Sequence, residues 1–424
     1  MELILIGIVL LLLSLAGTPL FTIIGAIGLL AFHFAGIDTA ALIVELYRLA
    51  DFPALIAIPL FTFAGHILAD SKAPQRLMNF VGAIFGWMPG GMAVVSLCTA
   101  ALFTAFTGAS GVTIIALGGL LYPSLLKYGY PEKFSLGLMT TSGSLGLLFP
   151  PSLPIILYAL VAKVSLDRLF IAGLVPGLLL IVILSAYSIR VGFNAKVERI
   201  PFSLSNVWNA LKGAAWELPL PILVNGGIYG GMFTATEAAA VTALYAMVVE
   251  IFIRKDLKLF KDVPRVIRES MVLVGAILIM LGSAMGLTNY MIDQEIPKML
   301  FGFISQFVGS KFLFLVVLNI MILVMNMIEI FSAIIIVVPL IVPVAMQYGV
   351  DPIHLGIIFL LNLELGYMTP PLGLNLFLSS IRFKRPLTSV YRAVLPFFAL
   401  VVLVLLLVTY FPNLSLALSG ALKK

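Results

Sequence analysis

Four polar segments interrupt long apolar stretches of the sequence, and they carry the side chains that could do chemistry. They are residues 107–113 (TGASGVT), 141–152 (TSGSLGLLFPPS), 326–332 (NMIEIFS) and 362–371 (NLELGYMTPP). Hydroxyl, amide and carboxylate oxygens are the ligands that hard cations prefer, and peptide N–H groups at a helix end can face an anion. The four segments therefore predict ion binding.

The segment at 107–113 lies between apolar runs of about a dozen residues on each side. A full membrane span needs about 20 residues, so runs of this length suit a re-entrant hairpin. Its tip would place Ser110 and Gly111 at mid-membrane depth. A close contact between two helices through small residues is the alternative.

Two Pro-Pro pairs, Pro150-Pro151 and Pro370-Pro371, interrupt helical patterns. Proline lacks a backbone donor and its ring clashes with the preceding helical turn. Carbonyl groups near Ser144 to Leu148 are therefore expected to lose their helical partners and to become ligands suited to sodium. A purely structural kink is the alternative.

Two carboxylates lie within apolar surroundings, Glu329 and Glu364. A carboxylate at mid-membrane depth is costly and indicates function by default. Glu329 could neutralise a bound cation or carry a proton; capping freed N–H groups is the alternative. Both carboxylates are expected to face cations or hydrogen-bond donors, because an anionic substrate could not lie against them uncompensated.

An internal repeat relates the first two segments to the last two. Seven residues recur after a fixed offset of 220, since 348 − 128 and 370 − 150 both give 220: Pro123, Tyr128, Gly129, Leu145, Gly146, Pro150 and Pro151 return as Pro343, Tyr348, Gly349, Leu365, Gly366, Pro370 and Pro371. Lysines flank the first Tyr-Gly, whereas Asp351 follows the second. This asymmetry indicates opposite orientations in the membrane.

Inverted repeats with broken helices at matching positions are typical of transporters that bind their substrate near the bilayer midplane. Backbone groups left unpaired in lipid cost several kcal/mol each unless protein, water or a ligand satisfies them. The fold class predicted is therefore an all-α integral membrane protein of inverted repeats, with two re-entrant hairpins and two broken transmembrane helices.

Composition agrees with a membrane protein and excludes a water-soluble fold. The chain is 62% hydrophobic and only 10% charged, whereas soluble domains carry about 25% charged residues. One membrane domain, 1–424, has room for roughly ten crossings. The net charge of +6 gathers beside apolar segments, as the positive-inside rule expects, so nucleic acid is not implied. Three scattered histidines are too few for a His-rich metal site.

The densest basic stretches, Arg190 to Arg199, Arg254 to Arg268 and Arg382 to Arg392, are expected on the cytoplasmic side. We predict a first inverted repeat at 1–216 and a second at 217–424. Residues 202–216 carry Trp208 and Trp216 at the flanks of an amphipathic pattern, which predicts an arm helix lying in the membrane interface.

In combination these motifs resemble the large membrane (M) subunit of the tripartite ATP-independent periplasmic (TRAP) transporters. The resemblance runs through most of the chain: Phe52 to Gly65, Gly108 to Thr113, Leu145 to Pro154, Phe233 to Ala240 and Leu361 to Leu376. The family usually has Asp followed by Pro or Thr at its second tip, whereas this chain has Glu329, Ile330 and Phe331.

The resemblance implies an elevator-type carrier in the bacterial inner membrane that is coupled to sodium (Na+). It also implies a small four-helix membrane subunit, expected as a separate chain, and a periplasmic binding protein. That protein would deliver a small carboxylate such as a C4-dicarboxylate, a sialic acid or a keto acid. Carried across residue by residue, the first sodium site would comprise Ser110, Gly111, Ser142, Gly143, Ser144 and Gly146. The second would comprise Glu329, Ser332, Gly366, Thr369 and Pro370.

The neighbouring polar side chains are the predicted substrate ligands: Thr107, Thr113, Thr141, Asn326, Asn362 and Asn375. A stand-alone ion-coupled anion symporter of similar architecture is an alternative function, and it would need no binding protein. A remote alternative is a rhomboid-type intramembrane serine protease, because Gly108-Ala109-Ser110-Gly111 matches Gly-x-Ser-Gly. Its serine needs a general base, yet His354 is expected at a membrane surface. The chain is therefore predicted not to be an enzyme.

Overall fold

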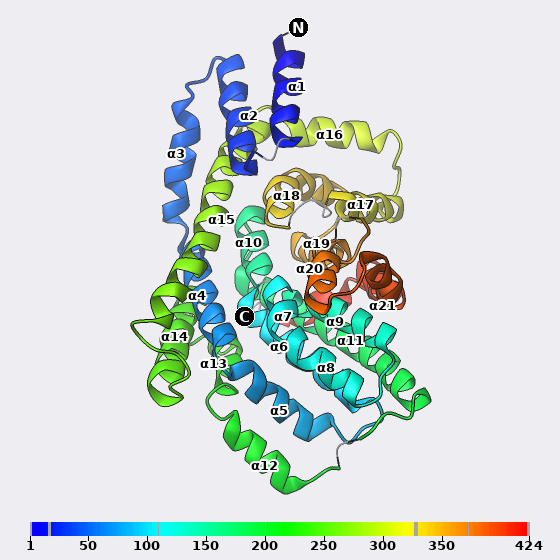
Figure 1. Ribbon diagram of the computed structural model, residues 1–424. Coiled ribbons are helices and arrows are strands. Elements are labelled where there is room, and N and C mark those ends of the chain that lie inside the picture. The colour runs from blue at the N-terminus through cyan, green and yellow to red at the C-terminus, as the bar shows by residue number, and fades with distance from the viewer. Residues whose placement is uncertain are drawn as a thin grey trace.

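The computed structural model describes residues 2–15, 18–108, 110–199, 201–325, 330–371 and 373–421. These residues form helices and no strand, as expected for an all-α membrane protein (Figure 1). The helices of the first part of the chain are α1 (Glu2–Leu15), α2 (Leu20–Phe34), α3 (Ala40–Arg48), α4 (Ala57–Asp70), α5 (Ala73–Phe85), α6 (Gly91–Thr107), α7 (Ser110–Ala116), α8 (Gly118–Lys127), α9 (Glu132–Ser142), the 3-10 turn η3 (Leu145–Leu148), α10 (Leu153–Ala162), α11 (Leu166–Asn194) and α12 (Leu204–Gly213).

The helices that follow are α13 (Pro219–Tyr229), α14 (Ala235–Val248), the π-helical turn η4 (Val249–Ile253), α15 (Asp262–Asp293), α16 (Ile296–Ser305), α17 (Lys311–Met325), α18 (Ile330–Gln347), α19 (Pro352–Tyr367), α20 (Leu374–Phe383), α21 (Leu387–Tyr410) and α22 (Asn413–Ala421). Two short 3-10 turns, Leu49–Asp51 and Pro53–Ile56, join α3 to α4.

Fewer helices are long enough to span a membrane than the chain length suggested. Five described helices are sufficiently long and apolar, or up to seven if each of two bent pairs counts as one span. The estimate of about ten is too high by this measure because several apolar helices, such as α6, α17 and α19, have 17 residues or fewer. Such helices suit the limbs of hairpins and the halves of broken spans.

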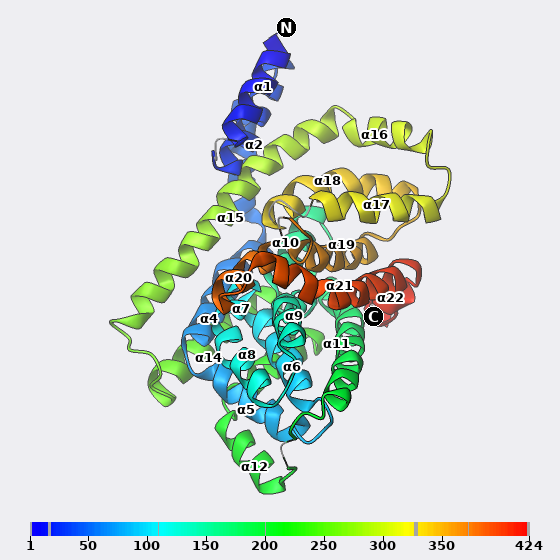
Figure 2. The same ribbon diagram turned by 45° about the vertical axis from the view of Figure 1, so that its right-hand side comes forward.

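The offset of 220 residues also relates the helices. Helix α6 begins at Gly91 and α17 at Lys311, while α9 begins at Glu132 and α19 at Pro352. Helix α5 precedes α6, and helix α16 precedes α17. These two helices, α5 and α16, lie at opposite ends of the molecule in both views (Figures 1 and 2). This placement supports an opposite orientation of the two copies; the boundaries 1–216 and 217–424 remain predictions.

The segments that follow the two Pro-Pro pairs pack against the opposite copy. Helix α20 contacts α7, α8 and α9, whereas α10 contacts α18 and α19. The helix that follows each break therefore packs against the other half. In this way one half contributes side chains to the polar segments of the other.

An ion-pair cluster fixes α5. Arg76 contacts Glu217 at 2.6 Å, Asp256 at 2.6 Å and Glu250 at 2.8 Å, and all three carboxylates are almost fully buried. Burial disfavours the charged form of Asp256, but hydrogen bonds from Arg76 and the Lys72 backbone outweigh it and lower its pKa. The cluster ties α5 to the segment from α13 to the loop after η4.

The predicted arm segment near 202–216 contains α12, which has no buried residue. Ser203 caps the helix by accepting from the Asn206 N–H. Lys212 lies over the ring of Trp208 at 5.2 Å, and Trp208 and Trp216 are both exposed. The segment is thus an exposed helix, as predicted; its position in the membrane interface remains a prediction.

Candidate functional site

The first polar segment forms the turn between α6 and α7. Gly108 adopts a left-handed backbone conformation with φ of 63°, and a Cβ there would lie 2.6 Å from Leu153 Cγ. Only glycine meets both requirements without strain. Helices α6 and α7 contact each other, and α7 and α8 are bent by 50°. Helix α6 therefore ends at Gly108 in a left-handed turn; the re-entrant hairpin remains a prediction.

This tip lies directly against the first Pro-Pro break. Thr104 Oγ1 is 2.7 Å from Thr113 Oγ1 and donates to the carbonyl oxygen of Gly143 at 3.0 Å. A Cβ on Gly146 would lie 2.3 Å from the Ala105 nitrogen, so the two backbones touch. The structure thus brings the Ser110 tip and the 142–146 segment together. Thr104 was missed from the sequence because it stands within an apolar run.

The first break runs from the end of α9 through η3 to α10. The carbonyl oxygens of Ser144 and Gly146 accept hydrogen bonds of 3.0 Å from Leu147 and Phe149. These are bonds of a 3-10 turn and not of an α-helix, so Ser144 and Gly146 exchange the expected α-helical partners for the donors of η3. A carbonyl oxygen has two lone pairs, so these groups can still bind a cation.

Asn375 reaches this break from α20, in the second half. Its amide nitrogen donates to the Thr140 carbonyl at 3.2 Å and to Ser144 Oγ at 3.4 Å. Thr140 in turn donates to Ser379 at 2.9 Å. Asn375, predicted as a substrate ligand, is thereby placed among the residues predicted for the first ion site.

Three buried oxygens around this break have no hydrogen-bond partner in the described part of the chain: Ser110 Oγ, Thr141 Oγ1 and Asn375 Oδ1. A buried polar atom without a partner costs about 1–3 kcal/mol. Each is a neutral hard oxygen, the kind of ligand that a hard cation prefers. The donor set therefore fits sodium better than a softer metal.

The other first-site predictions occupy the same region. Ser142 donates to the Met139 carbonyl at 3.2 Å, and a Cβ on Gly111 would lie 2.9 Å from Leu378 of α20. Thr107 is buried at the end of α6. Their role in ion or substrate binding remains a prediction.

The second predicted site is only partly described. Asn326 and Glu329 lie outside the described residues. Ser332 donates to Met280 Sδ of α15 at 3.1 Å. Thr369 donates to the Leu365 carbonyl at 2.7 Å, and the carbonyl of Gly366 accepts from the Thr369 N–H at 3.2 Å. Pro370 is exposed.

Asn362 belongs to a separate buried network. Its amide donates to Asn319 Oδ1 of α17 at 2.7 Å, and Asn319 donates to Thr409 of α21 at 3.3 Å. Among the described residues no hydrogen bond joins Asn362 to Asn375 or Thr141. The two halves thus place their corresponding polar residues in different surroundings.

Glu364 and His354, both on α19, are fully buried. Neither Glu364 oxygen has a hydrogen-bond partner within the described ranges. His354 contacts Ser415 Oγ at 2.7 Å and the Thr409 carbonyl at 3.3 Å. The α21–α22 turn therefore covers His354 within the protein, and its expected depth at a membrane surface stays a prediction. No contact pairs it with Ser110, which gives the protease alternative no support.

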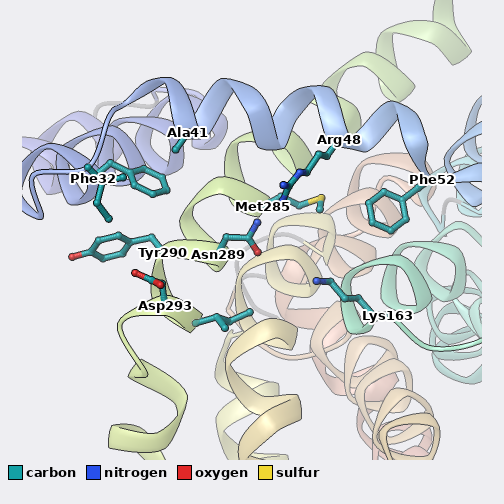
Figure 3. Close-up of a pocket in the computed structure, with 11 residues that line it drawn as sticks. Phe32, Ala41, Arg48, Phe52, Lys163, Met285, Asn289, Tyr290 and Asp293 are labelled. Carbon is teal, nitrogen blue, oxygen red and sulfur yellow. The ribbon is translucent and has the colours of Figure 1, made fainter.

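A cavity of about 570 Å³ opens between α2, α3, α15 and the α10–α11 junction. In Figure 3, Arg48 and Lys163 point into it from different elements, and Asn289 lies between them. Asp293 lies beside Tyr290 at the other end of the cavity (Figure 3). Sequence reasoning missed this site because Arg48 and Lys163 are 115 positions apart and belong to no motif.

Comparison with known proteins gives a consistent result. The family model described as "Tripartite ATP-independent periplasmic transporter, DctM component" matches residues 5–414. The C4-dicarboxylate TRAP transporter large permease protein DctM of Pseudomonas aeruginosa is 36% identical over 396 residues, covering 93% of this chain and 92% of that protein.

Two further comparisons bear on chain length and fold. The isethionate TRAP transporter permease protein DctMQ of Oleidesulfovibrio alaskensis is 33% identical over 375 residues, covering 87% of this chain and 58% of that longer protein. The crystal structure of the Alcanivorax borkumensis YdaH transporter superposes with a TM-score of 0.62 at 13% identity, covering 88% of this chain and 87% of that one. That last likeness concerns the fold alone.

Proposed function

Because the chain belongs to the DctM component family of the tripartite ATP-independent periplasmic (TRAP) transporters, we propose that it moves small organic acids across the membrane in a sodium-coupled cycle. As a large permease subunit it is an integral membrane protein and a transporter component. The observation that carries the coupling proposal is the group of unpartnered buried oxygens on Ser110, Thr141 and Asn375.

Sodium is proposed as a co-transported cargo held at the first break. Ser110 comes from the hairpin tip, Thr141 from the end of α9 and Asn375 from the opposite half. Loss of the ion would leave three buried oxygens unsatisfied, so its occupancy would stabilise the packing of tip, break and α20 together. This is how ion binding would prepare the neighbouring substrate site. The second site, at Glu329, Ser332, Gly366, Thr369 and Pro370, is proposed to bind another sodium ion.

The proposed movement is of the elevator type. Helix α15 packs with α2, α3 and α4, and its contacts with the repeated elements include α18. Because α10 and α20 are exchanged between the halves, both breaks belong to one packed unit. We propose that this unit slides along α15 while α5 stays tied by the Arg76 cluster.

The proposed cargo is a small carboxylate or sulfonate, as the names of the two relatives suggest. The proposed partners are a periplasmic binding protein and a small four-helix membrane subunit. The small subunit is proposed as a separate chain. The DctMQ relative is a longer polypeptide, of which this chain covers 58%. The bacterial inner membrane is the proposed location, with the three basic stretches in the cytoplasm.

The test is uptake into proteoliposomes that contain the permease and its small subunit, with a loaded binding protein outside. Succinate, isethionate, a sialic acid and pyruvate form the substrate panel. We expect accumulation of at least one compound when an inward sodium gradient is applied, and none with potassium in its place. Uptake that persists without sodium would contradict the coupling, and uptake without the binding protein would favour the stand-alone symporter.

Two variants sharpen this test. Ser110→Ala removes one of the three unpartnered oxygens, and Glu329→Gln removes the charge at the predicted second tip. Both are expected to raise the sodium concentration needed for half-maximal uptake. Unchanged sodium dependence in both variants would remove the two tips from the ion sites.

A further inference from the structure

The cavity shown in Figure 3 has walls from two parts of the molecule. We name it the outer vestibule and define it by Arg48, Phe52, Lys163, Met285 and Asn289. Arg48 comes from the end of α3 and Met285 and Asn289 from α15, whereas Lys163 follows α10. Any sliding of α10 along α15 would therefore change the vestibule.

The inner end of the vestibule continues as a narrow neck. A second cavity of only about 20 Å³ shares Lys163, Met285 and Asn289 and extends to Ile335 and Pro339 of α18. That volume holds little more than one water molecule. Ile335 and Pro339 lie on the helix that follows the predicted second tip in the sequence. An organic acid cannot pass the neck in this conformation.

The vestibule opens on the membrane side that faces away from two of the basic stretches. Helix α11 begins three residues after Lys163 and ends within Arg190–Arg199. Helix α15 begins within Arg254–Arg268 and ends at Asp293. Both helices are long enough to cross the membrane. With the basic stretches in the cytoplasm, Lys163 and Asn289 lie at the outer side.

Two cations at the outer side run against the positive-inside preference, so topology does not account for them. Lys163 has no carboxylate within ion-pair distance in the part of the chain that the structure describes. Its φ of 55° ends α10 in a left-handed turn, where the Val164 N–H donates to the Ala159 carbonyl at 3.0 Å. The turn fixes where the side chain leaves the backbone.

We propose that the outer vestibule is a first binding site for the carboxylate or sulfonate group of the transported acid, held between Arg48 and Lys163 before the neck opens. This inference rests on the proposed function and adds a second, earlier site. Charge-assisted hydrogen bonds from two cations recognise one anionic group. Asp293, at the far end of the vestibule (Figure 3), repels anions and keeps the acid at the end that adjoins the neck.

The first experiment separates this site from the midplane site by kinetics. Lys163→Gln is expected to raise the KM for the transported acid about tenfold, with kcat and the half-maximal sodium concentration unchanged, because only the capture step loses a cation. Lys163→Arg should retain the KM. Lys298→Gln is the matched control: Lys298 is an exposed lysine on α16 that pairs with Glu295 and does not line the vestibule. Equal effects of Lys163→Gln and Lys298→Gln would overturn the proposal.

The second experiment does not depend on sodium coupling. In a Cys98→Ala background, which removes the chain's one cysteine, Lys163→Cys is labelled from the outer side with a membrane-impermeant methanethiosulfonate. Succinate, isethionate, a sialic acid or pyruvate should slow labelling if it is the transported acid, and 2-aminoethyl methanethiosulfonate should restore the wild-type KM by returning a cation. Labelling that is slowed by none of the four compounds, or that occurs only from the inside, would contradict the vestibule even if sodium-driven uptake is confirmed.

Discussion

The two Pro-Pro breaks share a backbone pattern but differ in their surroundings. The first is buried, and side chains from both halves bond to it: Thr104 donates to Gly143, and Asn375 donates to Thr140 and Ser144. The second exposes Pro370 and Pro371, and the contact to its Pro371 carbonyl comes from the exposed Tyr391 hydroxyl at 3.1 Å. A repeated backbone therefore supplies two breaks that side chains have adapted to different tasks.

Helices α5 and α16, which precede α6 and α17, show the same contrast. Helix α5 is held by the buried Arg76 cluster, whereas α16 carries the exposed Lys298–Glu295 pair. Exposed ion pairs contribute about 0–1 kcal/mol, and breaking a buried one costs about 3–5 kcal/mol. One end of the molecule is thus fixed by charge, while the corresponding helix at the other end is not.

Replacing Arg76 tests this contrast most strongly. Arg76→Met leaves Glu217, Glu250 and Asp256 buried together without their shared cation, so we expect a loss of about 3–5 kcal/mol in unfolding free energy. Lys298→Met removes one exposed partner and should cost less than about 1 kcal/mol. Thermal unfolding of both detergent-purified variants measures the difference; equal midpoints would mean that the cluster does not anchor α5.

The sequence predicted the backbone breaks of the site better than the side chains that surround them. The offset of 220 located both breaks, because Pro and Gly act through local backbone geometry that the sequence displays directly. The position of Asn375 could not be predicted, since it depends on the exchange of α10 and α20 between the halves, a long-range packing event. Thr104 and Lys163 were missed for the same reason: their contacts come from other helices and not from neighbouring residues.

The burial of His354 shows the same limit. The sequence indicated that it lies beside the Tyr-Gly turn, but it did not indicate that the α21–α22 turn packs over it and contacts its ring through Ser415. The sequence reports where a chain turns, and only the packing of distant helices decides whether that turn is covered.

Asn375 and Asn362 test whether the two breaks bind ions alike. Asn375→Ala removes one of three unpartnered oxygens at the first break, so the sodium concentration for half-maximal uptake should rise about tenfold, which corresponds to about 1.4 kcal/mol. Asn362→Ala disrupts the network with Asn319 and Thr409, so it should lower thermal stability and leave the sodium requirement within about twofold. Both quantities are measured on the same proteoliposome preparations. The reverse pattern would move the ion site to the second break.

Thr104 and Tyr391 provide the finest comparison, because each donates a hydrogen bond to one of the two breaks. Thr104→Val keeps the side-chain shape but removes the bond to the Gly143 carbonyl and the contact with Thr113 in a fully buried position. The Gly143 carbonyl and the Thr113 hydroxyl lose their partner and gain no water in its place. The expected loss of unfolding free energy is therefore about 1–2 kcal/mol. Tyr391→Phe removes a bond at an exposed position, where water replaces the hydroxyl, and should cost less than about 0.5 kcal/mol.

The two variants are compared by chemical or thermal unfolding in one detergent. If Tyr391→Phe loses more unfolding free energy than Thr104→Val, the second break is better protected from water than the first. A partner subunit or the residues at the second tip would then cover it. The contrast drawn from Pro370 and Pro371 would then describe this chain alone and not the assembled transporter. A larger loss in Thr104→Val that persists after reconstitution with the small subunit would instead assign the difference in burial to the two breaks themselves.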